Sequence, residues 1–171
     1  KEMKEYIKSV GALTVICGVL AVILAITNSI TTSVIAENEA AAATEALRMV
    51  MPEGEGFEEI DISSYTLPEG ITKIHKEANG GYVVEVVGKG YGAGLTIMCG
   101  IDGSGAITGA KCLRSGETLG YEKTFGDGMV GKTADTIESV DTIAGATLTT
   151  GGYQAAVKNA FDAVKIVKGE A

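Results

Sequence analysis

A long uncharged segment near the N-terminus limits what this chain can fold into. No residue between Lys8 and Glu37 is charged, and residues 10–26 are rich in Val, Ile, Leu and Ala. A helix of about 20 apolar residues is long enough to cross the hydrocarbon core of a bilayer. The sequence therefore predicts a transmembrane helix at residues 9–36, with residues 1–8 on one side of the membrane and the chain after residue 36 on the other.

A cleaved signal peptide is the alternative interpretation of the same segment. Residues 34–36, Val-Ile-Ala, fit the small-residue pattern of a cleavage site. The apolar run is longer than the hydrophobic region of a usual signal peptide. We therefore expect a retained membrane anchor.

The charges on either side of the segment predict its orientation. Lys1, Lys4 and Lys8 precede it, whereas the first three charged residues after it are glutamates. Because basic residues stay in the cytoplasm, residues 1–8 should form a cytoplasmic tail and the chain after residue 36 should be exported. Removing the tail's three lysines and two glutamates from 14 basic and 22 acidic residues leaves the exported part with a net charge of −9. That charge argues against a nucleic acid partner.

The segment after the anchor is predicted to be helical and then irregular. Residues 37–51 are strong helix formers that end at Pro52. Residues 52–65 are acidic and contain glycine, which indicates a loop with one short element at residues 57–62. We therefore expect residues 37–70 to form a connecting helix and an acidic loop.

From residue 71 to residue 171 the pattern indicates one α+β domain. Four runs of β-branched or aromatic residues are separated by Gly-rich turns, of which Asn79-Gly80 is a strong hairpin signal. A further short strand is expected at residues 139–143. The expected fold class is α+β, a mostly antiparallel sheet with flanking helices, preceded by one N-terminal transmembrane helix. The four runs are residues 72–75, 82–87, 95–101 and 106–113.

The cysteines and the single histidine do not suggest a metal site. Cys99 and Cys112 fall in strand-like runs without Cys-x-x-Cys spacing, and no second histidine accompanies His75. A hairpin between the third and fourth runs would place Cys99 opposite Thr108 and not opposite Cys112. We therefore expect buried free thiols in preference to a disulfide.

The most informative motif lies at residues 141–151. Gly145 has no side chain and Ala146 has only a methyl group, so that a bulky group can approach the backbone closely. After Thr147, apolar residues recur at three- and four-residue steps and predict a helix that ends near Val167. The motif is therefore a turn of small residues that leads into a helix.

This motif, D-x-x-A-G-A-T-x-T, resembles the flavinylation signature of the FMN-binding domain family, D-x-x-[ST]-G-A-T-x-T. In that family FMN is held covalently, by a phosphoester bond from its ribityl phosphate to the threonine that ends G-A-T. The resemblance implies that FMN is attached to Thr147. Ala144 departs from the usual Ser or Thr, which removes a possible hydrogen bond but not the acceptor hydroxyl. The motif residues that the resemblance places at the cofactor are Asp141, Ala144, Gly145, Ala146, Leu148 and Thr149.

A phosphate on Thr147 also suits the predicted helix. With Thr149 or Thr150 as the N-cap, the phosphate would lie at the helix N-terminus. Free N–H groups and the helix macrodipole favour an anion there. A turn of small residues capped by threonine, without a cofactor, is the alternative.

Two further segments resemble the same family, in the same order along the chain. The segment that begins at Gly90 resembles the family's G-Y-G-G strand entry and places Tyr91 and Gly92 near the cofactor. The Glu-Thr-Leu-Gly loop resembles its E-T-x-G-L-G loop, which borders the isoalloxazine ring; here the loop lacks proline and is shortened. The resemblance implies that Thr118 donates to the ring and that Leu119 packs on its face. Alone, each segment is equally consistent with an ordinary turn. The residues of this loop are Glu117, Thr118, Leu119 and Gly120.

Within the family, the expected architecture resembles the single-span, FMN-carrying component of the Rnf-type ion-translocating ferredoxin:NAD oxidoreductases. The shared features are a short cytoplasmic tail, one N-terminal span and a single exported FMN domain. The resemblance implies an electron carrier in a translocase complex of the cell membrane, with its FMN domain on the extracytoplasmic side. Its implied partners are the other membrane subunits of a redox-driven ion pump, the lipid bilayer and a flavin transferase.

Other functions remain open at this stage. The related FMN-carrying component of the sodium-pumping NADH:quinone oxidoreductase shares the same plan but is typically longer. A free-standing exported flavoprotein, acting as a reductase or electron shuttle, is a second possibility. A pilin-like filament protein would explain the apolar segment but not the G-A-T motif.

Overall fold

The chain divides into two units, residues 1–43 and residues 44–171. The computed structural model describes residues 3, 11, 13–22, 24, 27–28 and 44–170. Among these residues, no helix combines the length and the apolar character that crossing a membrane requires. The predicted cytoplasmic tail and most of the predicted transmembrane helix lie outside the described residues.

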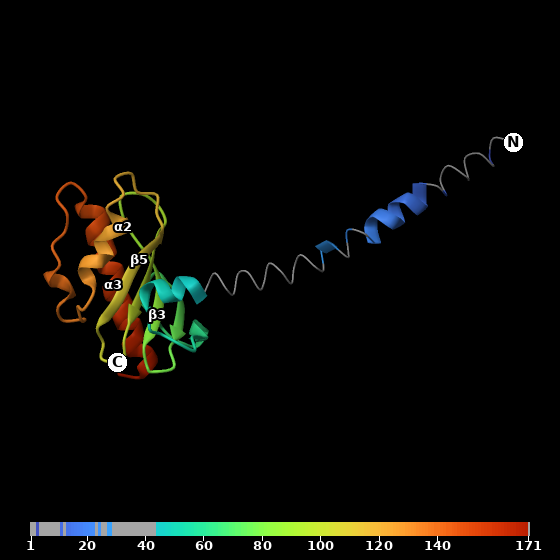
Figure 1. Cartoon of the computed structure of the whole chain (residues 1–171). Coiled ribbons are helices and arrows are strands. Elements are labelled where there is room, and N and C mark those ends of the chain that lie inside the picture. The colour runs from blue at the N-terminus through green and yellow to red at the C-terminus, as the bar shows by residue number, and fades with distance from the viewer. Residues whose placement is uncertain are drawn as a thin grey trace. The chain divides into compact units, whose positions relative to one another are not determined.

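The second unit is built on a five-stranded antiparallel sheet whose strands follow one another in sequence order. Figure 1 shows the long C-terminal helix α3 (Thr147–Lys168) lying along this sheet. The α+β class and the antiparallel sheet are confirmed. The strands are β1 (Glu58–Glu59), β2 (Ile71–Lys76), β3 (Tyr82–Gly88), β4 (Leu95–Ile101) and β5 (Ile107–Arg114).

The central strands β3 and β4 are mostly apolar because both faces of the sheet are covered. On one face, Val84 packs in a cluster with Tyr153 and other buried residues of α3. On the opposite face, Val83 packs in a second cluster with Val50 from the helical residues 44–50. The compact unit therefore starts within the segment that we expected to be a connection.

The two predicted hairpins form, but the register of the second differs from the prediction. Cys99 lies opposite Ala110 instead of Thr108, and Cys112 lies opposite Ile97. Ile101 pairs with Ile107 where the prediction paired it with Ala106, and an irregularity between Gly100 and Ile101 shifts the pairs beyond it by one more residue. Both cysteines are free thiols; Cys99 is buried and Cys112 half-buried.

Short helices fill the chain between β5 and α3. The prediction of a strand at residues 139–143 is wrong. Ser139 is the last residue of a 3-10 turn, and residues 140–143 pair with no strand. A side chain holds the backbone of this turn and of the residue after it: Gln154 Nε2 donates to the carbonyls of Ile137 (2.7 Å) and Val140 (3.3 Å). The remaining short elements are η1 (Ile62–Ser64), α2 (Glu122–Phe125), η2 (Gly126–Met129) and η3 (Ile137–Ser139).

Candidate cofactor site at the start of helix α3

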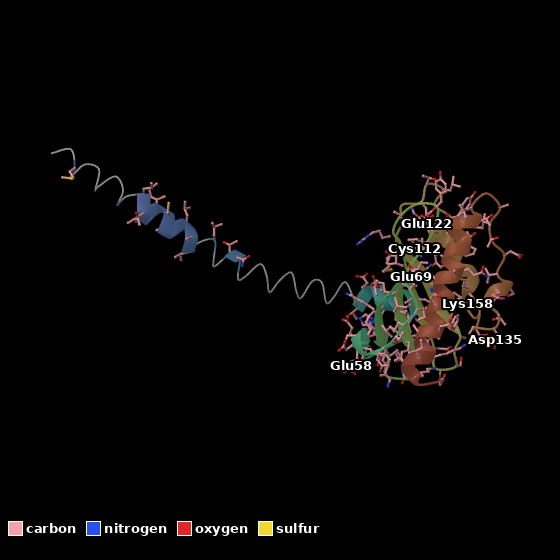
Figure 2. All side chains as sticks on the ribbon, turned by 180° about the vertical axis from the view of Figure 1, so that it is seen from behind. Glu58, Glu69, Cys112, Glu122, Asp135 and Lys158 are labelled. Atoms are coloured by element: carbon pink, nitrogen blue, oxygen red, sulfur yellow. The ribbon has the colours of Figure 1, made fainter. Side chains whose placement is uncertain are left out.

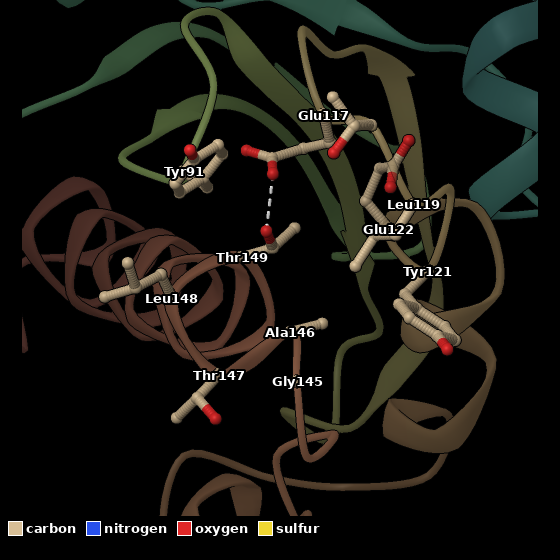
Figure 3. A pocket seen from close by; sticks show the side chains of 11 residues that line it. Tyr91, Glu117, Leu119, Tyr121, Glu122, Gly145, Ala146, Thr147, Leu148 and Thr149 are labelled. Carbon is tan, nitrogen blue, oxygen red and sulfur yellow. Dashed lines mark hydrogen bonds between the residues drawn. The ribbon is translucent and has the colours of Figure 1, made fainter.

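A cavity of about 440 Å³ opens beside the first turn of α3. Cavities of roughly 300–1,000 Å³ are typical of small-molecule sites. Three segments that are distant in sequence form its walls: the β3–β4 loop with Tyr91, residues 117–122, and residues 145–149 (Figure 3). The predicted site residues that line the cavity are Tyr91, Glu117, Thr118, Leu119, Gly145, Ala146, Thr147, Leu148 and Thr149.

Four of the expected residues do not line the cavity. Gly92 and Gly120 lie in the loops that form its walls, and Asp141 and Ala144 lie in the segment that leads to α3. Asp141 and Ala144 are exposed. The structure therefore gathers all three expected segments at one place, although not every residue in them contacts the cavity.

Helix α3 begins three residues earlier than an N-cap at Thr149 would require, and four earlier than one at Thr150. Its first residue is Thr147, and Ala146 is the N-cap without a side-chain hydrogen bond. Gly145 has a φ of 85°, a left-handed conformation that glycine adopts without strain, and so turns the chain into the helix. The prediction that Thr149 or Thr150 caps the helix is wrong, since both lie within its first turn.

The three threonines of this turn have different partners. Thr149 Oγ1 donates to Glu117 Oε2 at 2.5 Å. Thr150 Oγ1 donates to the Ala146 carbonyl (3.0 Å) and accepts from the Ile143 N–H (3.2 Å). Thr147 is exposed, and within the described part of the chain its hydroxyl has no hydrogen-bond partner. Figure 3 shows its side chain directed away from the Thr149–Glu117 pair.

Glu117 joins all three walls of the cavity. Its Oε2 accepts from Thr149 on α3, and its Oε1 accepts from the Gly92 N–H in the β3–β4 loop at 2.9 Å. A Cβ at position 92 would overlap the Gly116 carbonyl, so a glycine is required for this close approach. Both carboxylate oxygens of Glu117 therefore have protein partners, and Glu117 holds the loops together.

We expect Thr149→Val to weaken this junction without changing the shape of the side chain. A hydrogen bond to a charged group contributes about 1.5–3 kcal/mol, so the free energy of unfolding should fall by about that amount. Urea unfolding of the full chain in detergent measures it. Thr124→Val is the matched control, because Thr124 is an exposed helical threonine and a surface substitution should change stability by less than about 0.5 kcal/mol. Equal unfolding free energies for the two variants would contradict the role of Thr149.

The sequence analysis missed two wall residues, Tyr121 and Glu122. Glu122 is 2% exposed; its Oε1 accepts from Ser115 Oγ at 2.8 Å, and its Oε2 has no partner among the described residues. A glutamate in an acidic chain is usually solvated, so no sequence signal marked it. Figure 2 shows Glu122 and Cys112 near each other at one end of the domain. Burial raises the pKa of the Cys112 thiol, and the nearby charge of Glu122 raises it further.

The remaining surface of the site is apolar and unusually exposed. Tyr91, Leu119 and Leu148 line the cavity with 76%, 64% and 67% of their surface accessible. Exposed apolar side chains gathered at one place mark a binding surface. The described wall residues include two carboxylates and no Lys, Arg or His, so the donors that they offer to a bound anion are backbone N–H groups and hydroxyls.

The fold and the site together define an α+β domain with a cavity of small-molecule size at the start of a helix. A family model for the FMN-binding domain matches residues 90–162, which include β4, β5, α2 and most of α3. No curated protein matches the chain. The family match supports the assignment of this segment to an FMN-binding domain family. Such a domain suggests a flavoprotein that carries electrons.

Proposed function

We propose that this chain is a membrane-anchored electron-transfer protein that carries FMN in a phosphoester bond to Thr147. The observation that carries the proposal is the difference among the three threonines at the start of α3. Thr149 and Thr150 use their hydroxyls in protein hydrogen bonds, whereas the Thr147 hydroxyl is exposed, has no hydrogen-bond partner among the described residues and lies at the wall of the cavity. Thr147 is therefore the hydroxyl in this turn that can be modified without loss of a structural contact.

The first turn of α3 suits the phosphate of FMN. Because no side chain caps the helix, the backbone N–H groups of residues 147–149 have no acceptor within the described part of the chain. These groups and the positive end of the macrodipole of a 22-residue helix favour an anion. The helix therefore supplies the charge stabilisation that the acidic walls cannot.

The rim of the cavity suits the ring of FMN. A flavin supplies transfer of one or two electrons when bound, and the protein must orient its ring and limit contact with water. Leu119 and Leu148 offer apolar surface on two different walls, and Thr118 offers a hydroxyl beside them. Thr118 is exposed and makes no side-chain hydrogen bond to the described residues, so its hydroxyl is available to the polar edge of the ring.

The attachment requires an activated flavin and a second protein. The Thr147 oxygen forms a bond to the flavin phosphorus, and an existing bond from that phosphorus to a leaving group breaks. The hydroxyl proton leaves with that group. Simple FMN has only a hydroxide to lose, so the donor must carry the flavin phosphate as an anhydride. The described wall residues include no basic side chain to act on this phosphate, and in this proposal a separate flavin transferase supplies that function.

The first unit supports anchoring to a membrane. The described residues of 13–22 are helical, and apolar side chains such as Leu13, Ile16 and Leu20 are more than half exposed. A covalent cofactor also suits an exported site, where no pool of FMN replaces what dissociates. On this basis we place the chain in an ion-translocating ferredoxin:NAD oxidoreductase of the Rnf type, with the other membrane subunits as electron donor and acceptor.

Purification in mild detergent tests this function. The chain should isolate in a complex with other membrane subunits, and its flavin should be reduced when a nicotinamide or ferredoxin donor is added to that complex. After dissociation of the complex, the same donors should no longer reduce it. A chain that isolates alone and exchanges electrons directly with soluble acceptors would instead be an electron shuttle.

We expect the second unit to lie outside the cell and residues 1–8 to lie in the cytoplasm. An impermeant thiol reagent applied to intact cells should label Glu55→Cys but not Lys8→Cys, since residue 55 is exposed on the second unit. Cys17 and Cys112 are replaced by serine, whereas burial raises the pKa of Cys99 to about 12 and keeps it unreactive. Labelling of the Glu55→Cys variant only after lysis would contradict this orientation.

A further inference from the structure

Glu122 contains a buried polar atom that the protein leaves without a partner. The side chain enters the cavity wall from the first residue of α2 and is 2% exposed. Ser115 satisfies Oε1, but Oε2 accepts no hydrogen bond from the described residues. An unsatisfied buried group costs about 1–3 kcal/mol, and more when it is charged. Such atoms in folded proteins usually have an unseen ligand or water as partner.

The chemistry of the cavity indicates what kind of donor is missing. Glu117, the other carboxylate in the walls, already accepts two hydrogen bonds from the protein. The N–H groups at the start of α3 serve the phosphate end of a bound FMN. At its other end, the polar edge of the oxidised isoalloxazine ring carries one N–H group, N3–H, between two carbonyls. A carboxylate oxygen complements that N–H and repels the carbonyls on either side of it, so it fixes the orientation of the ring.

We propose that Glu122 Oε2 accepts the N3–H of the flavin ring. This inference rests on the proposed function, because it requires FMN on Thr147. Thr147 then fixes the phosphate end of the cofactor and Glu122 the ring end. The negative charge of Glu122 also opposes the addition of electrons to the ring, so it lowers the midpoint potential of the flavin.

Hydrogen exchange of the flavin N3–H tests this contact in the full chain. Cells grown on ¹⁵N medium supply labelled FMN attached to Thr147, and NMR of the protein in detergent follows the N3–H signal. In the wild type this proton should exchange at least about tenfold more slowly than in free FMN, the factor that about 1.4 kcal/mol of protection gives. Glu122→Ala should remove most of this protection.

Asp127→Asn is the matched control for a lost negative charge. Asp127 lies just after α2, is exposed, pairs with Lys111 and does not line the cavity. The Asp127→Asn variant should leave the protection of N3–H unchanged, and it should raise the midpoint potential of the flavin less than Glu122→Gln does. If Glu122→Ala does not fold, this difference in potential between the two charge-removing variants decides the matter.

The possible outcomes distinguish a failure of the Glu122 contact from a failure of the proposed function. A wild-type chain that carries FMN but whose N3–H exchanges as fast as in free FMN would refute the role of Glu122 alone. Unchanged protection in Glu122→Ala, or equal potentials in Glu122→Gln and Asp127→Asn, would do the same. A wild-type chain without the added mass of FMN would refute the proposed function itself.

Discussion

Replacement of Thr147 by alanine is expected to remove all covalently bound flavin from the chain. The substitution deletes the hydroxyl that forms the phosphoester, and no other residue in the first turn has a free one. Because Thr147 is exposed and unpaired, the free energy of unfolding should change by less than about 0.5 kcal/mol. Flavin fluorescence of the denatured protein in a gel measures attachment, and urea unfolding measures stability.

Two variants control this experiment. Thr147→Ser retains a hydroxyl at the helix start and should keep covalent flavin, although with a smaller yield because serine is less restricted in its rotamers. Thr142→Ala removes a nearby exposed threonine outside the cavity wall and should leave attachment unchanged. Flavin fluorescence in Thr147→Ala equal to that of the wild type would show that the attachment point lies elsewhere.

Gly152→Val should destabilise the domain more than any substitution discussed above. Gly152 lies in the second turn of α3, where a Cβ would overlap the carbonyl of Lys89, the residue after β3. The overlapping atoms belong to the backbone, so no side-chain rotation relieves the clash. We expect the free energy of unfolding to fall by at least about 3 kcal/mol. Covalent flavin should decrease in parallel, because the displaced helix carries Thr147.

Gly151→Ala is the control for this substitution. It changes the preceding glycine of the same helix, where no atom lies near an added Cβ. Alanine in place of an unconstrained helical glycine should stabilise the fold by about 0.5–1 kcal/mol. If both variants unfold at the same urea concentration, the claim that α3 packs too closely against Lys89 for a side chain at residue 152 is contradicted.

The sequence predicted the strands well because both signals that define them are local. Runs of β-branched residues predicted β2 to β5 to within one or two residues, and Asn79-Gly80 predicted the turn between β2 and β3. The spacing of apolar residues gave α3 for the same reason. The resemblance to the FMN-binding domain family selected three candidate segments, and the structure brings these segments to one cavity.

The errors in prediction came from interactions that a local pattern does not record. The pairing irregularity at Gly100 changed the register of β4 and β5. The Val140 carbonyl, in the predicted strand, accepts a hydrogen bond from the Gln154 side chain and not from a neighbouring strand. Glu122 is buried only because the four-residue α2 folds against the domain, and a helix of that length has no periodicity to detect.

The mass of the intact chain, isolated from the cells that produce it, tests the central claim most directly. We predict the mass of the polypeptide plus one FMN less one water, with the added mass confined to the proteolytic fragment that contains Thr147. Fragmentation of that peptide should place the phosphoester on residue 147 and not on Thr149 or Thr150. An unmodified mass, or a flavin on another residue, would contradict the account.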